Sequence, residues 1–168
     1  LIFRGIAFEF RFKAVEGKRG FWNWAFCIGS VVAAFAQGAV VGTFIQGFDT
    51  LDKRFVGGAF DWLTPFTVMT GLGLVAGYAL IGACWLVLKT EGGLQQRIRG
   101  WALKLLAAVM VFFVVISVWT PLVDDYVRER WFGFVNWLWI IPALTVMVAF
   151  ALWRFLKLGH DATPFVAT

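Results

Sequence analysis

The chain has 168 residues, of which 61% are hydrophobic and 15% charged, and its formal net charge is +5. Soluble domains average roughly 45–50% apolar and about 25% charged residues. A chain this short exposes much of its surface, so a soluble fold would need far more polar residues. The composition therefore excludes a soluble globular domain and a disordered chain. It also excludes a nucleic-acid-binding protein, because the basic residues are spread thinly between apolar blocks.

The first residues, Leu1, Ile2 and Phe3, are apolar and have the character of a helix cut in its middle. No charged leader and cleavage pattern precedes them, so we do not expect them to form a signal peptide. We expect the sequence to be an internal portion of a longer membrane protein. Residues 1–20 then form the inner end of a preceding helix.

Four stretches without charged residues divide the rest of the chain. A membrane-spanning helix needs roughly 17–25 mainly apolar residues, and each stretch is long enough. The sequence predicts an all-α integral membrane protein, with residues 1–168 forming one portion of a helical bundle. The predicted transmembrane spans are about 22–47, 62–88, 101–119 and 134–156.

The charges of the connecting segments orient these spans. Three segments (4–19, 89–104 and 154–157) hold 11 of the 15 Lys and Arg residues. The other two (49–61 and 124–130) hold the remaining four, with six of the ten acids. Basic loops stay in the cytoplasm. We therefore expect a multi-pass protein of the bacterial inner membrane whose residues 1–20, 89–100 and 157–168 are cytoplasmic.

The tryptophans follow the same pattern. Tryptophan prefers the headgroup level of a bilayer. Its ten copies fall near the predicted span ends, so an interfacial belt is one interpretation, and a stacking platform for a cofactor or quinone is the other. Those expected at the inner ends are Trp22, Trp24, Trp85, Trp101 and Trp153, and those at the outer ends are Trp62, Trp119, Trp131, Trp137 and Trp139.

Local signals set some of the span ends. Thr64 followed by Pro65 suits the first turn of the second span, because a hydroxyl caps the helix and proline needs no N–H there. Pro121 follows the third span and is expected to end it. Pro142 lies inside the fourth span and is expected to kink it.

Glycine spacing predicts how the helices pack. Gly38 and Gly42 in the first span, and Gly73 and Gly77 in the second, are four residues apart. Small residues at this spacing let helix backbones approach closely in lipid. We expect these faces to contact another helix. The third span, at residues 105–118, carries large aliphatic and aromatic side chains and is expected to face lipid at the periphery.

The sequence offers few groups for metal or haem chemistry. Cys27 and Cys84 have no metal-site spacing, so no metal site is predicted. His160, the one histidine, lies in the C-terminal tail. The other haem-ligand types available within the spans are methionine, cysteine and tyrosine, at Met69, Met110, Met147, Cys27, Cys84 and Tyr78. We do not expect this chain alone to hold a haem.

No ionisable residue lies deep in a predicted span. Such a residue would mark a proton or ion path, so its absence argues against a proton-coupled transporter built from these helices. Gln37 is the deep polar residue that costs most to leave unpaired. It makes either a hydrogen bond between helices or a contact to a quinone or a proton-carrying water.

Two predicted cytoplasmic segments are dense in charge. In residues 4–13 the charged side chains, among them Arg4, Glu9 and Arg11, alternate with large aromatics. Lys89 and Glu91 mark the second segment. A solvated cap with snorkelling side chains explains such segments without a function, and a functional motif is the alternative.

Several short motifs resemble one protein family when their order and spacing are taken together. They are Arg4-Gly5-x-x-Phe8-Glu9-Phe10-Arg11, Gly29-Ser30, Gln37-Gly38, Thr64-Pro65-Phe66, Gly77-Tyr78-Ala79-Leu80-x-Gly82 and Lys89-Thr90-Glu91-Gly92. They resemble subunit II of the cytochrome bd-type quinol oxidases. The stretch at 77–92 is most similar to the cyanide-insensitive branch. The resemblance covers most of residues 3–100 and is weaker beyond.

The resemblance implies a function. Such oxidases oxidise a membrane quinol, reduce dioxygen to water and contribute to a proton gradient. Subunit I of the family carries haem b and haem d, whereas subunit II usually carries none and stabilises the complex. The chain would then be a haem-free structural subunit, not catalytic by itself, with subunit I, quinol and membrane lipid as partners. A bound quinone is compatible with this role.

Two other functions remain open at this stage. A small-molecule transporter is suggested by the glycine-rich spans and the predicted kink at Pro142, which resemble broken transporter helices. A purely structural membrane anchor is the third option. The motif-rich cytoplasmic segments favour the oxidase subunit over an anchor.

Overall fold

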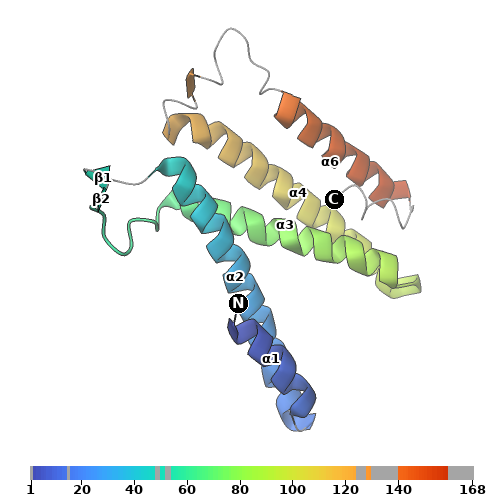
Figure 1. Cartoon of the computed structure of the whole chain (residues 1–168). Coiled ribbons are helices and arrows are strands. Elements are labelled where there is room, and N and C mark those ends of the chain that lie inside the picture. The colour runs from blue at the N-terminus through green and yellow to red at the C-terminus, as the bar shows by residue number, and fades with distance from the viewer. Residues whose placement is uncertain are drawn as a thin grey trace.

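The computed structural model describes residues 2–14, 16–47, 50–51, 54–123, 128–129 and 140–158. The described chain is mainly helical (Figure 1). Its helices are α1 (Ile2–Lys13), the short 3-10 helix η1 (Glu16–Lys18), α2 (Arg19–Gln46), α3 (Pro65–Lys89), α4 (Gly92–Val123) and α6 (Ile140–Leu158). A two-residue antiparallel ladder joins β1 (Thr50–Leu51) to β2 (Arg54–Phe55).

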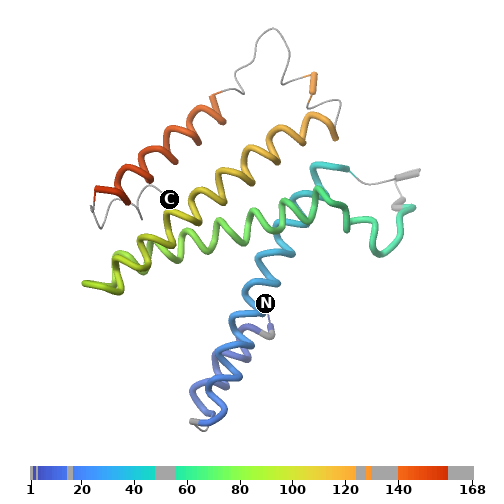
Figure 2. The backbone as a smooth tube through the Cα atoms, turned by 180° about the vertical axis from the view of Figure 1, so that it is seen from behind, coloured from blue at the N-terminus to red at the C-terminus, as the bar shows by residue number. Residues whose placement is uncertain are grey.

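Helices α3, α4 and α6 lie side by side, with α4 in the middle (Figures 1 and 2). Helix α2 crosses α3 near the end where α3 begins. Helix α1 folds back along the first half of α2, and this hairpin projects away from the other helices. The predicted peripheral position of residues 105–118 is therefore wrong, because α4 packs against helices on two sides.

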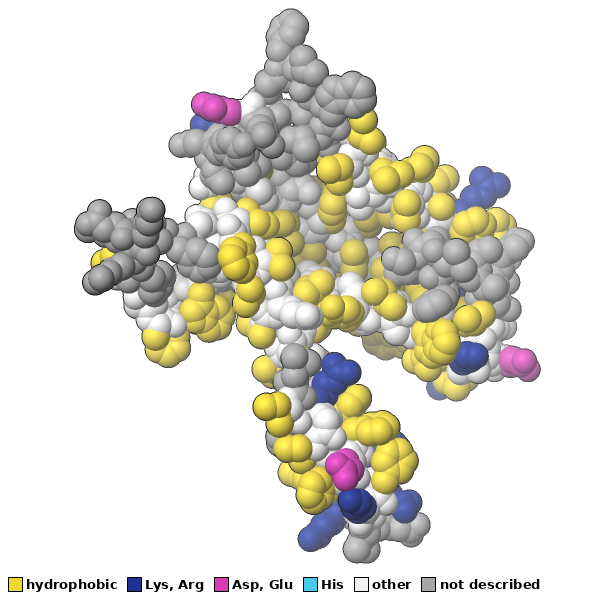
Figure 3. Space-filling view, in the orientation of Figure 1, with side chains coloured by type: hydrophobic (Ala, Val, Ile, Leu, Met, Phe, Trp, Pro, Cys, Tyr) yellow, Lys and Arg dark blue, Asp and Glu magenta, His cyan; other side chains and the backbone are white. Residues whose placement is uncertain are grey.

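Four of the helices, α2, α3, α4 and α6, are long and apolar enough to cross a membrane. This confirms the predicted all-α membrane fold. Large hydrophobic side chains cover much of the face in Figure 3. Such a surface is stable in lipid, where helices are held together by close packing and hydrogen bonds instead of the exclusion of water.

The predicted loop at residues 89–100 is mostly helix. Helix α3 ends at Lys89, and α4 begins at Gly92, whose φ of 68° lies in the left-handed region that glycine adopts readily. The Gln95 side-chain amide donates to the Val87 carbonyl at 3.0 Å and ties the two helices together at this turn. Residues 94–99 are mostly good helix formers, so the helix continues past the apolar segment.

The prediction for Pro121 needs correction. Pro121 lies within α4, which ends two residues later at Val123. A proline ring clashes with the preceding helical turn, so the residues after it can remain helical. Pro142 is the third residue of the described helix α6. The preceding turn lies outside the described residues, so the kink expected at Pro142 stays a prediction. The predicted span residues 134–139 lie outside the described residues.

The predicted cap at Thr64 is confirmed. The Thr64 hydroxyl accepts a hydrogen bond from the Thr67 backbone N–H at 3.2 Å, and the Thr67 hydroxyl accepts one from the Thr64 N–H at 2.9 Å. Pro65 is the first residue of α3. This reciprocal capping box satisfies backbone donors that would otherwise be left unpaired at the helix start.

The buried core lies where α3, α4 and α6 meet. Its apolar side chains interlock at one end of these helices, the end where α3 and α6 finish and α4 begins. The buried members are Leu80, Ala83, Cys84, Ala102, Leu106, Leu152 and Leu156. This core fixes how far the three helices are shifted along their axes relative to one another, and so it positions the side chains around it.

Candidate functional site

Close backbone contact defines the crossing of α2 and α3. A Cβ atom added to Gly38 would lie 2.6 Å from the Thr70 carbonyl oxygen and 2.7 Å from the Gly71 Cα. One added to Gly42 would meet Thr70 and lie 3.0 Å from the Thr67 Cα. Both glycines are buried. The two helices can approach this closely because neither glycine carries a side chain.

Buried threonines follow the same crossing. The Thr43 hydroxyl donates to the Ala39 carbonyl at 2.8 Å, and the Thr70 hydroxyl donates to the Thr67 carbonyl at 2.9 Å. The Thr67 hydroxyl donates to the Trp62 carbonyl at 2.6 Å. Each buried hydroxyl is therefore satisfied locally, which is required in a medium without water. The cluster supports packing and offers no unpaired group to a ligand.

Gln37 faces Tyr78 across the α2–α3 contact. The Tyr78 hydroxyl donates to the Gln37 side-chain oxygen at 3.2 Å. Tyr78 is 49% exposed, so this polar pair lies on the outside of the described helices. Two residues 41 positions apart are thus joined by a hydrogen bond between helices. The alternative role of Gln37, a contact to a quinone or water, stays a prediction.

The other predicted glycine pair has two different environments. A Cβ on Gly73 would lie 3.3 Å from the Ile116 side chain and 3.4 Å from that of Phe112, both on α4. A Cβ on Gly77 would meet nothing within 4 Å among the described residues. Gly73 therefore lies at the α3–α4 interface, whereas no described residue packs against the position of a Gly77 side chain.

The charged residues of the N-terminal motif lie on α1. Glu9 pairs with Lys13 at 2.9 Å, in an exposed pair one helical turn apart. The Arg4 guanidinium lies 5.4 Å from the centre of the Phe26 ring on α2, and that of Arg11 lies 5.9 Å from the Phe12 ring. Exposed pairs of this kind contribute little to stability. Their arrangement is that of a charged cap on an apolar hairpin.

Lys89 and Glu91 lie at the turn between α3 and α4, both exposed. This turn is far from the α1–α2 hairpin in both views (Figures 1 and 2). The structure therefore does not bring the two charged motifs together. Any joint role for them would have to act through another part of the protein.

Three lysine–tryptophan pairs occur at one end of the α3–α4–α6 layer, and the sequence reasoning missed them. The ammonium groups of Lys89, Lys104 and Lys157 lie 5.0, 4.9 and 4.8 Å from the ring centres of Trp85, Trp101 and Trp153. Within each pair the residues are three or four positions apart on one helix, a spacing visible in the sequence. Such pairs are typical of the headgroup level, where both side chains are amphipathic.

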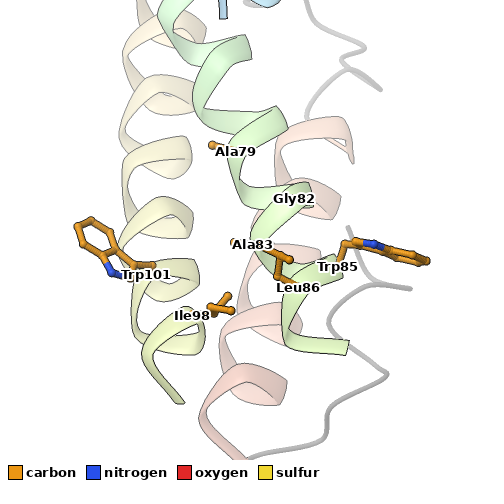
Figure 4. Close-up of a pocket in the computed structure, with 7 residues that line it drawn as sticks. All are labelled: Ala79, Gly82, Ala83, Trp85, Leu86, Ile98 and Trp101. Atoms are coloured by element: carbon orange, nitrogen blue, oxygen red, sulfur yellow. The ribbon is translucent and has the colours of Figure 1, made fainter. Parts of the chain in front are cut away.

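Two apolar grooves open near these pairs. One, of about 560 Å³, lies between α3 and α4. Figure 4 shows Trp85 and Trp101 projecting to opposite sides of it, with small side chains of α3 between them. Its lining residues are Ala79, Gly82, Ala83, Trp85, Leu86, Ile98 and Trp101. The second, of about 380 Å³, lies between α4 and α6 and includes Met110 and Trp153.

Three of the described haem-ligand types, Cys84, Tyr78 and Met110, lie in three different environments. Cys84 is fully buried in the apolar core, and the Tyr78 hydroxyl is bonded to Gln37. Met110 lines the α4–α6 groove, which offers no second donor beside it. Among the described residues no group of three or more His, Cys, Asp or Glu could hold a metal ion. His160 lies outside the described residues. Cys84, Tyr78 and Met110 therefore do not come together at one site.

Comparison with a family model and with known proteins relates the chain to the second subunit of cytochrome bd oxidases. The family model described as cytochrome bd terminal oxidase subunit II matches residues 1–168. The chain is 30% identical to cytochrome bd-I ubiquinol oxidase subunit 2 of Escherichia coli K12, over 88% of this chain and 47% of that protein. It is 26% identical to cytochrome bd ubiquinol oxidase subunit 2 of Bacillus subtilis, over 77% of this chain and 39% of that protein.

A third relative is the probable cytochrome oxidase subunit 2 of Haemophilus influenzae, which is 28% identical over 89% of this chain and 47% of that protein. The chain thus spans about half the length, or less, of these relatives. The comparisons do not favour the transporter alternative, and the cyanide-insensitive branch stays a prediction. With four apolar helices and a family match over its whole length, the chain is a multi-pass bacterial inner-membrane protein that belongs to the cytochrome bd terminal oxidase subunit II family.

Proposed function

We propose that this chain is part of a haem-free structural subunit in a terminal oxidase that oxidises quinol and reduces dioxygen to water. In this proposal another subunit carries haem b and haem d, and this chain contributes helix packing to the complex instead of catalytic groups. The family match over residues 1–168 is the observation that carries the proposal. The scattered positions of the described haem-ligand types support the haem-free part.

The proposal assigns each group of residues a role. Gly38, Gly42 and Gly73 bring helices into contact. Gln37 and Tyr78 join α2 to α3 on an exposed face. The charged groups of Arg4, Glu9, Arg11, Lys89 and Glu91 mark the cytoplasmic surface, together with residues 1–20, 89–100 and 157–168. This orientation follows the distribution of basic residues between the connecting segments.

Affinity purification of the tagged full-length protein from mild detergent tests the proposal. We expect a second, haem-containing chain to co-purify, and the complex to consume dioxygen when a soluble quinol is supplied. Purification without any haem-containing chain would contradict it. Transport of a solute into proteoliposomes by the purified protein without a partner would support the transporter instead.

A further inference from the structure

The position of the α3–α4 groove along the helix axes follows from how α3 and α4 are aligned. Helices α3 and α4 run antiparallel, since Phe66 lies against Trp119 with ring centres 5.9 Å apart, while the Gln95 amide reaches the Val87 carbonyl at the opposite end. Trp85 and Trp101 consequently stand at the same height, one on each side of the groove (Figure 4). Tryptophan at a common height marks the headgroup level of a membrane.

Two cationic groups lie at that same height. Helical side chains lean towards the N-terminus of their own helix. Lys89 therefore reaches back to Trp85, one turn earlier on α3, and Lys104 reaches back to Trp101 on α4. Because the helices are antiparallel, the two lysines approach the tryptophan level from opposite directions. Each ammonium lies over a ring that lines the groove, at 5.0 and 4.9 Å.

The groove is lined by apolar residues and leaves open space between them. A Cβ added to Gly82 in its wall would meet nothing within 4 Å. Its volume of about 560 Å³ falls in the range of small-ligand pockets, roughly 300–1,000 Å³. Its lining includes no charged residue, but each of its two tryptophans has a lysine ammonium over its ring. An apolar groove whose tryptophans each contact a cation complements a molecule that has an apolar tail and an anionic head.

The residues around the groove carry a net positive charge, like the two lysines. Residues 89–104 contain four basic side chains (Lys89, Arg97, Arg99 and Lys104) and one acid, Glu91. Basic residues near a membrane surface attract anionic lipids. The α4–α6 groove differs, because a single lysine, Lys157, pairs with a tryptophan of its lining.

We propose that the groove between α3 and α4 binds an anionic phospholipid. One acyl chain lies along the small side chains of α3, and the phosphate lies between Lys89 and Lys104. A zwitterionic lipid such as phosphatidylcholine would fill the apolar groove equally well, but its choline cation would offset the attraction of its phosphate to the two ammonium groups. The proposal depends on this groove and its charges, and not on whether the chain serves an oxidase.

Photolabelling with two matched lipids tests this proposal. The full-length protein, with the chains that co-purify with it, is reconstituted into phosphatidylcholine nanodiscs. A trace of phosphatidylglycerol or of phosphatidylcholine is added, each carrying the same diazirine on its acyl chain, and adducts are mapped by mass spectrometry. We expect adducts on residues 79–86 and 98–101, with roughly a tenfold preference for phosphatidylglycerol, because each lysine near the surface favours anionic lipid.

Three variants separate the charge from the groove. The double variant Lys89→Gln and Lys104→Gln should reduce labelling by phosphatidylglycerol to the level of phosphatidylcholine. Lys157→Gln makes the same chemical change beside the other groove and should keep the preference. Gly82→Leu adds a side chain to the groove wall and leaves both lysines in place, and a Cβ at this position would meet nothing within 4 Å among the described residues. It should remove the adducts of both lipids.

Each other outcome overturns the proposal. Equal labelling by the two lipids in the unmodified protein would show a groove without headgroup selection. Absence of adducts on residues 79–86 and 98–101 would show that another helix covers the groove. Loss of the preference in Lys157→Gln as well would show a general effect of surface charge.

Discussion

Gly38 of α2 lies so close to Gly71 of α3 that a Cβ on Gly38 would be 2.7 Å from the Gly71 Cα. The neighbouring obstacle, at 2.6 Å, is the Thr70 carbonyl oxygen, which is also backbone. Backbone atoms cannot move aside as the end of a flexible side chain can. The position of α2 on α3 therefore depends on the missing side chain at this residue.

Replacing Gly38 with alanine should force the two helices apart. Overpacking of a tight contact costs typically about 1–3 kcal/mol, and the backbone obstacle places this variant at the upper end. We expect a lower thermal unfolding midpoint for the full-length protein in detergent. Gly82→Ala is the matched control, because it adds the same methyl group to a helical glycine with open space around it. Equal midpoints for the two variants would contradict the close contact.

The Gln37–Tyr78 hydrogen bond can be measured by a double-mutant cycle. Tyr78→Phe and Gln37→Leu each remove the bond, so the effect of the pair should be smaller than the sum of the single effects. Hydrogen bonds between membrane helices average about 0.6 kcal/mol and reach about 1.7. We expect a coupling energy in this range from unfolding in mixed detergents.

The same variants distinguish the two interpretations of Gln37. If Gln37 only joins helices, quinol oxidation by the purified complex should fall no more than its folded fraction does. A loss of oxidation in Gln37→Leu at unchanged stability, without a matching loss in Tyr78→Phe, would favour a contact to quinone or water instead.

Thr64 should stabilise the start of α3. Thr64→Ala removes the hydroxyl that accepts from the Thr67 N–H and that also donates to the Gln46 side-chain oxygen at 2.6 Å. Loss of a helix cap costs typically about 1 kcal/mol, so unfolding should occur earlier. Thr145→Ala is the control, since among the described residues the Thr145 hydroxyl bonds to the Ile141 carbonyl of its own helix alone. A control as destabilised as Thr64→Ala would argue against a specific cap.

The proposed orientation predicts which engineered thiols an impermeant maleimide reaches. Gly93→Cys lies at the start of α4, next to the turn that follows α3, and Gly58→Cys lies between β2 and α3. Both glycines have exposed positions. Gly93→Cys should react only in inside-out vesicles, and Gly58→Cys only in right-side-out ones. The reverse pattern would overturn the assignment from basic residues.

Sequence patterns predicted the features that depend on local chemistry. The charge-free stretches located the four long helices, and Thr64 with Pro65 marked a helix start, because capping and burial in lipid leave direct traces in residue type. The same reasoning placed a loop at 89–100, where α4 already runs from Gly92. Charges mark where the membrane ends, and a helix can continue beyond that point.

Packing partners were harder to predict. The large side chains of α4 gave no sign that it lies between two helices, because lipid and a neighbouring helix accept the same apolar surface. The bond between Gln37 and Tyr78 depends on how α2 crosses α3, which no local pattern records. The lysine–tryptophan pairs could have been found, since their spacing of three or four residues is readable from the sequence.

The central claim is that this subunit belongs to a haem-containing oxidase but holds no haem itself. The most direct test is a dithionite-reduced minus air-oxidised spectrum of the full-length protein with its partners, repeated on the separated subunit. The account predicts haem b and haem d bands in the complex and none in the separated subunit. Haem bands in the separated subunit, or a complex without any haem bands, would contradict it.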